Sequence, residues 1–367
     1  MLYFLIIIGF VLSFLLSVII IPRILVVAYR KRLFDIPNER KVHHGIIPRL
    51  GGISFVPAIL FSISFTTGLR YLIGYEISGD MLCIIIPEFY FFICGLTLLY
   101  LAGIKDDLVG LRYRSKFVVQ IIAASLIPLS GLWINNLYGI LGIHELAPWL
   151  GIPLTILVVV FICNAINMID GIDGLASGLS IISLGLLGSL YLSDCQWIYA
   201  SLAFSVLGTL LPFFYYNVFG KANHCTKIFM GDTGSLTLGY ILAFLAICYT
   251  RVNPEIHPPY SSGVIIIAFS SLIVPAFDLI RVVLIRARNH KPLFLADRNH
   301  IHHKCLSAGL TGRKAVICML GLACAFILLN MVLINTINNN FILVLDILLW
   351  FASIEWLNKS KEHVNDK

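Results

Sequence analysis

Long apolar runs separated by short polar segments dominate this sequence. Each run can cross the roughly 30 Å hydrocarbon core of a bilayer as a helix of about 20 residues. Backbone groups cannot stay unpaired in lipid and barrel-type alternation is absent, so the spans must be helices. The pattern therefore predicts an all-α, polytopic membrane helix bundle. We place about eleven transmembrane helices at 2–28, 52–70, 83–103, 117–134, 150–168, 174–193, 197–216, 235–250, 262–285, 315–335 and 340–357.

The composition also indicates a membrane protein. Of the 367 residues, 59% are hydrophobic and only 12% are charged, whereas a soluble domain has about 25% charged residues. No linker or repeat divides the chain, so we expect a single integral membrane domain at 1–357 and a short cytoplasmic tail at 358–367. The nine cysteines include no CxxC pair, which favours reduced thiols over a disulfide framework.

The basic residues predict the orientation in the membrane. Most of the 26 lysines and arginines fall in alternate loops, at 29–51, 104–116, 217–234 and 286–314, and in the tail. By the positive-inside rule these loops are cytoplasmic, so the N-terminus lies outside and the C-terminus inside. The net charge of +7 is thus a topology signal that also suits anionic lipid headgroups, and it does not indicate nucleic-acid binding.

Acidic residues gather in the same cytoplasmic loops. Asp106 and Asp107 follow the third span, and adjacent carboxylates repel each other unless a cation or a proton relieves them. A solvated loop with a helix-capping aspartate is the alternative. The recurrence of acids in other loops of this face favours a site over that alternative.

The segment NAINMIDGIDGLASG carries the second acidic pair, Asp170 and Asp173, in a glycine-framed turn that begins the next span. A helix N-terminus offers free amide donors to a phosphate or a metal-bound diphosphate. Asn164 and Asn167 lie one helical turn upstream, and amide oxygens are hard ligands that suit magnesium. A simple capped turn is the alternative, but it leaves two asparagines within an apolar run unexplained.

Two further segments complete the polar face. Asp232 in IFMGDTGSL precedes another span, where it could also be a simple helix start, and Phe229 could stack on a flat base or anchor the interface. DRNHIHH holds His300, His302 and His303. The histidine spacing lacks HExxH geometry, so cationic and hydrogen-bonding contacts to a diphosphate are favoured over a zinc site. Acids, histidines and basic residues on one face suggest a metal-assisted site for a phosphorylated substrate.

These motifs together resemble a known family. PRLGG, GIKDDLVGL, NAINMIDGIDGLA, FMGDTGSL and HIHH stand in the order found in the polyprenyl-phosphate N-acetylhexosamine-1-phosphate transferases, glycosyltransferase family 4. The HIHH form is similar to the undecaprenyl-phosphate GlcNAc-1-phosphate transferase branch. The sister branch, phospho-MurNAc-pentapeptide transferase, usually carries a triple-histidine run and ten spans.

The resemblance implies a role for each matching residue. Metal ligands would be Asn167 and Asp232. Catalytic residues beside the reacting phosphates would be Asp106, Asp107, Asp170 and His300. Residues that contact the nucleotide, the phosphates or the sugar would be Arg49, Lys116, Asp173, Asn217, Phe229, Arg298, His302 and His303.

The implied reaction transfers a sugar-1-phosphate from a UDP-N-acetylhexosamine, UDP-GlcNAc above all, to undecaprenyl phosphate with release of UMP. Mg²⁺ is the implied cofactor, with Mn²⁺ as an alternative ion, and a bacterial inner membrane is the implied location. In-line attack and a covalent aspartyl-phosphate route both remain open, and the oligomeric state, a homodimer included, is undetermined. The rivals are the muramyl-pentapeptide enzyme and an ion-coupled transporter, which would place its ionisable residues at the bilayer midplane on broken helices.

Overall fold

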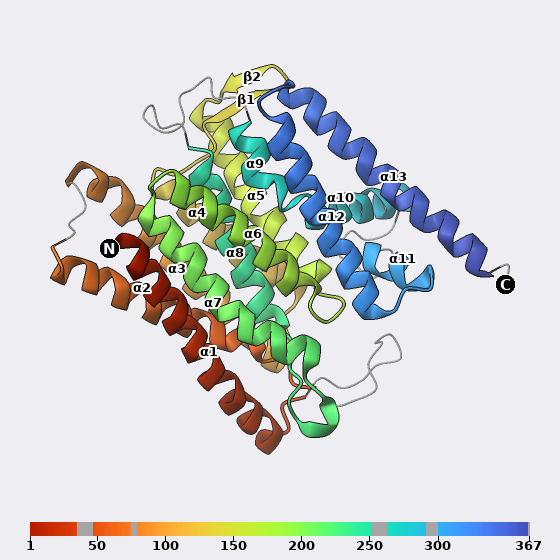
Figure 1. Ribbon diagram of the computed structural model, residues 1–367, viewed down its shortest axis with the longest axis horizontal. Coiled ribbons are helices and arrows are strands. Elements are labelled where there is room, and N and C mark those ends of the chain that lie inside the picture. The colour runs from red at the N-terminus through yellow and green to blue at the C-terminus, as the bar shows by residue number, and fades with distance from the viewer. Residues whose placement is uncertain (35–46, 75–78, 252–262, 291–299, 366–367) are drawn as a thin grey trace.

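The computed structural model describes residues 1–34, 47–74, 79–251, 263–290 and 300–365, and these form a helical bundle (Figure 1). The prediction of an all-α membrane bundle is confirmed. The elements are α1 (Leu2–Lys31), η1 (Gly51–Ser54), α2 (Phe55–Leu72), α3 (Gly79–Val109), α4 (Tyr113–Leu129), β1 (Asn136–Ile140), β2 (Ile143–Glu145), α5 (Pro148–Ile169), α6 (Leu175–Ser193), α7 (Trp197–Phe219), η2 (Ala222–His224), α8 (Gly231–Tyr249), α9 (Val264–Ser270), α10 (Ile273–Arg288), α11 (Ile301–Ser307), α12 (Gly312–Leu333) and α13 (Asn339–Asn365).

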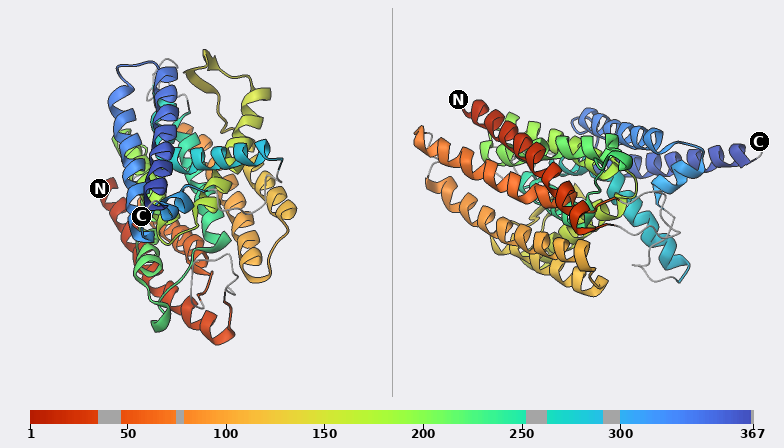
Figure 2. Two further views of the ribbon diagram at one scale, coloured as in Figure 1. Left: turned by 90° about the vertical axis from the view of Figure 1, so that its right-hand side faces the viewer. Right: turned by 90° about the horizontal axis from the view of Figure 1, so that it is seen from below.

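Within the described ranges, nine helices are long and apolar enough to cross a membrane, and the bent pair α9 and α10 would make a tenth span. The span predicted at 117–134 corresponds to α4, which begins earlier and has 17 residues. Helix α13 continues to Asn365 and so extends into the segment predicted as a tail. Figures 1 and 2 place α1 and α2 on the side of the bundle opposite α12 and α13.

The structure divides the span predicted at 262–285 into α9 and α10, which meet at an angle of 81°. Pro275 lies in the first turn of α10 and has no N–H to donate to the carbonyl of Ser271, four residues earlier. That carbonyl instead accepts a hydrogen bond from Ser183 of α6 at 3.3 Å. The missing helical bond explains why the two helices meet at a bend.

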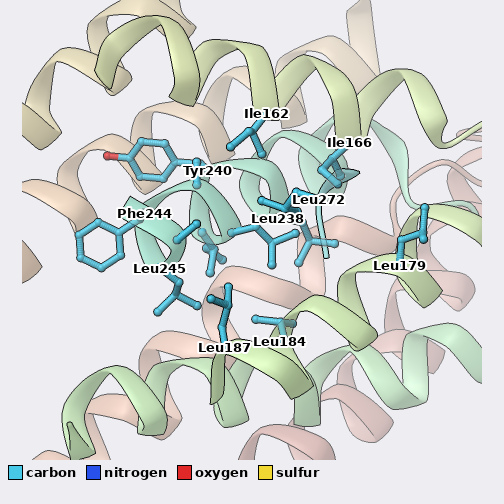
Figure 3. Packing of buried hydrophobic residues seen from close by; sticks show 14 of the residues in the cluster. Ile162, Ile166, Leu179, Leu184, Leu187, Leu238, Tyr240, Phe244, Leu245 and Leu272 are labelled. Atoms are coloured by element: carbon cyan, nitrogen blue, oxygen red, sulfur yellow. The ribbon is translucent and has the colours of Figure 1, made fainter. Parts of the chain in front are cut away.

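Helix α8 forms the centre of the bundle. Every residue from Thr233 to Tyr249 is buried, and the helix packs against α3, α5 and α6. Figure 3 shows Leu238, Tyr240 and Phe244 of α8 within a cluster of apolar side chains from α5 and α6. Because α8 is enclosed, the polar residues at its start are held in a fixed position.

A two-stranded antiparallel hairpin, β1 and β2, lies between α4 and α5, at the end of the bundle that the charge pattern assigns to the outside. Asn339 donates from Nδ2 to the carbonyl of Tyr138 at 2.7 Å, and the Tyr138 hydroxyl donates to the carbonyl of Thr250 at 2.8 Å. The hairpin therefore ties the start of α13 to the end of α8. The sequence pattern did not predict this hairpin.

Candidate active site

The start of α8 is capped by Asp107 of α3. The Asp107 carboxylate accepts hydrogen bonds from the backbone N–H of Asp232 at 2.7 Å, from the N–H of Thr233 at 2.9 Å and from the Thr233 hydroxyl at 2.6 Å. The first N–H groups of a helix lack partners within the helix, and its dipole favours a negative charge there. Both carboxylate oxygens are thus occupied by α8, and the predicted place of Asp107 beside the reacting phosphates stays a prediction.

The PRLGG segment runs against the start of α8. Phe229 donates from its backbone N–H to the carbonyl of Pro48 at 2.8 Å and accepts from the N–H of Gly51 at 3.0 Å. A Cβ atom added to Gly52 would lie 2.1 Å from the backbone nitrogen of Gly234. Only glycine allows the two backbones to approach so closely. The glycines of PRLGG therefore serve to pack this segment against the start of α8, which brings Arg49 to the site.

Four helices contribute to a charged cluster around Asp232 of α8. The Lys116 ammonium of α4 lies 2.5 Å from Asp232 Oδ1 and 3.1 Å from Asp106 Oδ2 of α3. Asn167 of α5 donates from Nδ2 to the same Asp232 oxygen at 2.5 Å and to the Ser235 hydroxyl at 2.7 Å. A cation therefore already offsets two acids at the point where the sequence predicted a charge-relieving ion.

Asp170 lies at the end of α5, beside this cluster. The side chain keeps some contact with solvent. Burial, and then the charges of Asp232 and Asp173, raise the pKa of the Asp170 carboxyl to about 7, while Arg49 acts in the opposite direction. The carboxyl can therefore hold or release a proton near neutral pH.

The turn between α5 and α6 is joined to the loop before α8. The Lys227 ammonium lies 2.5 Å from Asp173 Oδ2. Asn217 of α7 is buried, accepts from the N–H of Gly174 at 2.6 Å and donates to the carbonyl of Ile228 at 2.9 Å. Both polar atoms of the Asn217 amide thus hold backbone in place. Its contact with nucleotide or phosphate stays a prediction.

The histidines lie over the same turn. The rings of His300 and His302 are parallel within 7° at a centroid distance of 5.5 Å, and the His303 ring is 4.2 Å from that of His302. A Cβ atom on Gly171 would lie 2.2 Å from His302 Nε2, so the imidazole packs directly on the glycine. Burial and the neighbouring His303 and His300 lower the pKa of His302 to about 3. His302 is therefore a neutral imidazole near neutral pH and carries no positive charge.

Phe229 and Arg49 occupy the edge of this site. The Phe229 side chain is half-buried, and the Arg49 side chain is exposed. Arg298 lies outside the described residues. Sequence reasoning missed two residues: Lys227, which pairs with Asp173, and Asp278, whose Oδ2 lies 2.8 Å from Nδ1 of His300. The basic character of the loop before α8 was the available signal for Lys227.

The described part of the chain forms no metal centre from acids and histidines alone. Among the described residues, no group of three or more His, Cys, Asp or Glu side chains is arranged to hold a metal ion. The Asp232 carboxylate and the Asn167 amide meet beside Lys116, with the amide nitrogen facing Asp232. A carboxylate oxygen together with an amide oxygen is a hard donor set that fits Mg²⁺ better than zinc.

Comparison with known proteins identifies the family of this chain. The family model for glycosyl transferase family 4 matches residues 89–250. A probable undecaprenyl-phosphate N-acetylglucosaminyl 1-phosphate transferase of Bacillus subtilis (strain 168) is 33% identical over 314 residues, which are 85% of this chain and 80% of that protein. Undecaprenyl-phosphate alpha-N-acetylglucosaminyl 1-phosphate transferases of Yersinia pestis and Escherichia coli (strain K12) are 30% and 31% identical, over 79% of this chain and 74% of each relative. The chain therefore belongs to glycosyl transferase family 4 and is a membrane-embedded transferase.

Proposed function

We propose that the protein transfers GlcNAc-1-phosphate from UDP-GlcNAc to undecaprenyl phosphate on the cytoplasmic face of a bacterial inner membrane and releases UMP. The observation that carries this proposal is the cluster in which Lys116 joins Asp106 and Asp232 at one end of a membrane bundle. A site at the cytoplasmic surface of the membrane can receive both a lipid phosphate and a soluble nucleotide. The names of the curated relatives support the same donor and acceptor.

The chemical step is a substitution at phosphorus. An oxygen of the lipid phosphate forms a bond to the sugar-bearing phosphorus while the bond from that phosphorus to the UMP oxygen breaks, which yields undecaprenyl-diphosphate-sugar. The second pKa of a phosphate monoester is about 6, so the acceptor is mostly dianionic at neutral pH and needs no strong base. Asp106 and Lys116 then serve to position the phosphates.

Asp232 and Asn167 would hold Mg²⁺ or Mn²⁺, because carboxylate and amide oxygens are the ligands these hard cations prefer. The Asn167 amide nitrogen faces Asp232, so the amide would turn to offer its oxygen to the ion. When bound, the ion would offset negative charge on the diphosphate and on the departing UMP. The chain itself contributes Lys116 to the same charge balance.

Direct in-line transfer is favoured over an aspartyl-phosphate route. Both Asp107 oxygens accept hydrogen bonds from α8. Asp106 accepts from the N–H of Leu111 at 2.6 Å through Oδ1 and pairs with Lys116 through Oδ2. Carboxylates engaged in this way are poor nucleophiles, which supports positioning as their role.

The uridine and the sugar of the donor would lie on opposite sides of the turn between α5 and α6. This turn carries Asp170 and Asp173 and is called the acidic turn below. Phe229, with Asp173 and its partner Lys227, would line the uridine pocket. His302 would face the sugar phosphate with His300 and His303, and it would do so as a neutral imidazole.

Metal affinity is expected to depend on pH through Asp170. The pKa of its carboxyl is raised to about 7, so the charged form that favours a nearby cation is present above that pH and is lost below it. Mn²⁺ binding, followed by electron paramagnetic resonance, should strengthen as the pH rises from 6 to 8. Asp170→Asn should remove that rise, whereas an unchanged slope in the variant would assign the proton to another group.

Donor choice tests the proposed function itself. Purified protein with undecaprenyl phosphate and Mg²⁺ should form lipid product and UMP from UDP-GlcNAc and none from UDP-MurNAc-pentapeptide, because no described residue beside His302 is identified as a contact for a peptide. Mass spectrometry of the lipid product measures the outcome when both donors compete. Preference for the muramyl donor would assign the chain to the sister reaction, and turnover of neither donor would overturn the proposal.

A further inference from the structure

A buried carboxylate on α10 holds the histidine segment in place. Asp278 is 1% exposed. Its Oδ2 lies 2.8 Å from Nδ1 of His300, and its Oδ1 accepts from the backbone N–H of Ile301 at 2.9 Å. Arg281 donates to Oδ1 at 3.0 Å. One side chain thus contacts both the ring and the backbone of the segment that begins α11.

These contacts define the state of the His300 ring. An ionised carboxylate only accepts hydrogen bonds, so His300 Nδ1 must carry the hydrogen. The other ring nitrogen, Nε2, then remains available to a substrate atom. Carboxylates fix the tautomer and the orientation of functional histidines in this way in many sites.

The backbone contact adds a second constraint. His300 is the N-cap residue of α11 and makes no side-chain capping bond. Asp278 instead accepts the N–H of Ile301, which would otherwise be an orphan donor in a buried position. The carboxylate therefore sets where α11 begins as well as how the His300 ring is turned.

The effect reaches the acidic turn through ring packing. His300 is parallel to His302, and His302 packs on Gly171, the neighbour of Asp170. Rotation of the His300 ring would remove a face against which His302 packs. Three successive contacts, Asp278 with His300, His300 with His302 and His302 with Gly171, therefore connect α10 to the turn after α5.

We propose that Asp278 is a positioning residue for the transfer reaction, which presents His300 Nε2, as a hydrogen-bond acceptor, to an O–H or N–H group of the donor sugar and aligns the His300–His302 pair over the turn. This inference rests on the proposed function, because the reaction supplies its kinetic test. The simpler alternative is that Asp278 only balances the charge of Arg281, three residues later on the same helix.

A double-mutant cycle separates positioning from general destabilisation. Asp278→Asn and His300→Gln should each lower kcat/KM for UDP-GlcNAc by about 10–100-fold, by analogy with the loss of the partners that orient metal-bound histidines. The double variant should lose no more than His300→Gln alone, since Asp278 acts through His300. Additive losses, or an Asp278→Asn variant with wild-type kcat/KM, would overturn the inference.

Two controls accompany the cycle. Asp346→Asn also removes a buried carboxylate, which accepts from Asn330 at 3.0 Å between α12 and α13, and it should retain the wild-type kcat/KM. Asp278→Asn combined with Arg281→Gln should stay impaired. Recovery of activity in that double variant would show that charge balance is the only role of Asp278.

A spectroscopic readout does not depend on turnover. In ¹⁵N-histidine-labelled protein, the His300 signal, assigned by its loss in His300→Gln, should report the Nδ1–H tautomer in wild type and a changed tautomer population in Asp278→Asn. An unchanged signal would contradict the contact. If wild type turned over no sugar nucleotide while this signal changed, the proposed function would fail and the Asp278–His300 contact would stand.

Discussion

Asp107→Asn is expected to lower both the stability of the bundle and its turnover, whereas Asp106→Asn should lower turnover alone. Asp107 accepts three hydrogen bonds from Asp232 and Thr233 with two oxygens. Asparagine keeps one oxygen and turns an NH₂ group toward those donors, so at least one of them loses its acceptor. Leaving a buried donor unpaired costs about 1–3 kcal/mol. Because the same bonds fix the start of α8, displacement of Asp232 should lower turnover by about 10²-fold.

Asp106→Asn is the matched comparison. The asparagine oxygen can still accept from the N–H of Leu111, so the turn after α3 is retained, while the charge that faces Lys116 is lost. Denaturant-induced unfolding in detergent measures the stability of both variants, and UMP release measures their turnover. Equal loss of stability in both variants, or none in Asp107→Asn, would contradict the capping role assigned to Asp107.

The extent to which the fold follows from the sequence depends on the element. Helices such as α1 and α5 were predictable because lipid leaves an apolar run of their length no other conformation. The bend between α9 and α10 was not, since it depends on Pro275 and on a carbonyl that α6 satisfies through Ser183. The β1–β2 hairpin depends on contacts with Asn339, far along the chain, which local patterns do not contain.

The candidate site shows the same division. Acids at span ends and on one face indicated a charged cluster, and the structure brings Asp106, Asp232 and Lys116 together. The sequence could not distinguish the roles of Asp106 and its neighbour Asp107, because the difference comes from the start of α8, more than a hundred residues away. Asp278 was missed for a related reason: a carboxylate three residues before Arg281 fits an ordinary ion pair within one helix, while the contact of Asp278 with His300 is tertiary.

Asp232→Ala is expected to remove turnover almost entirely while leaving the bundle folded. The side chain sits at the start of an enclosed helix and faces Lys116 and Asn167, so its loss removes the negative charge around which the cluster is built. Removal of one electrostatic contact to a transition state typically lowers kcat by about 10²–10³-fold. The loss should be at least that large here, because metal binding would be lost with it.

Three measurements decide this prediction. UMP release gives the turnover, Mn²⁺ binding by electron paramagnetic resonance gives the metal affinity without any reaction, and thermal unfolding shows whether the helix survives. Thr237→Ala is the control, since the Thr237 hydroxyl bonds only to backbone carbonyls of its own helix in the described structure. Asp232→Asn should retain a weak metal site, because one oxygen remains, and should need more Mg²⁺ for half-maximal rate. An Asp232→Ala variant that keeps more than about a tenth of its turnover, or wild-type turnover that persists in EDTA, would place the metal and the chemistry elsewhere on this face.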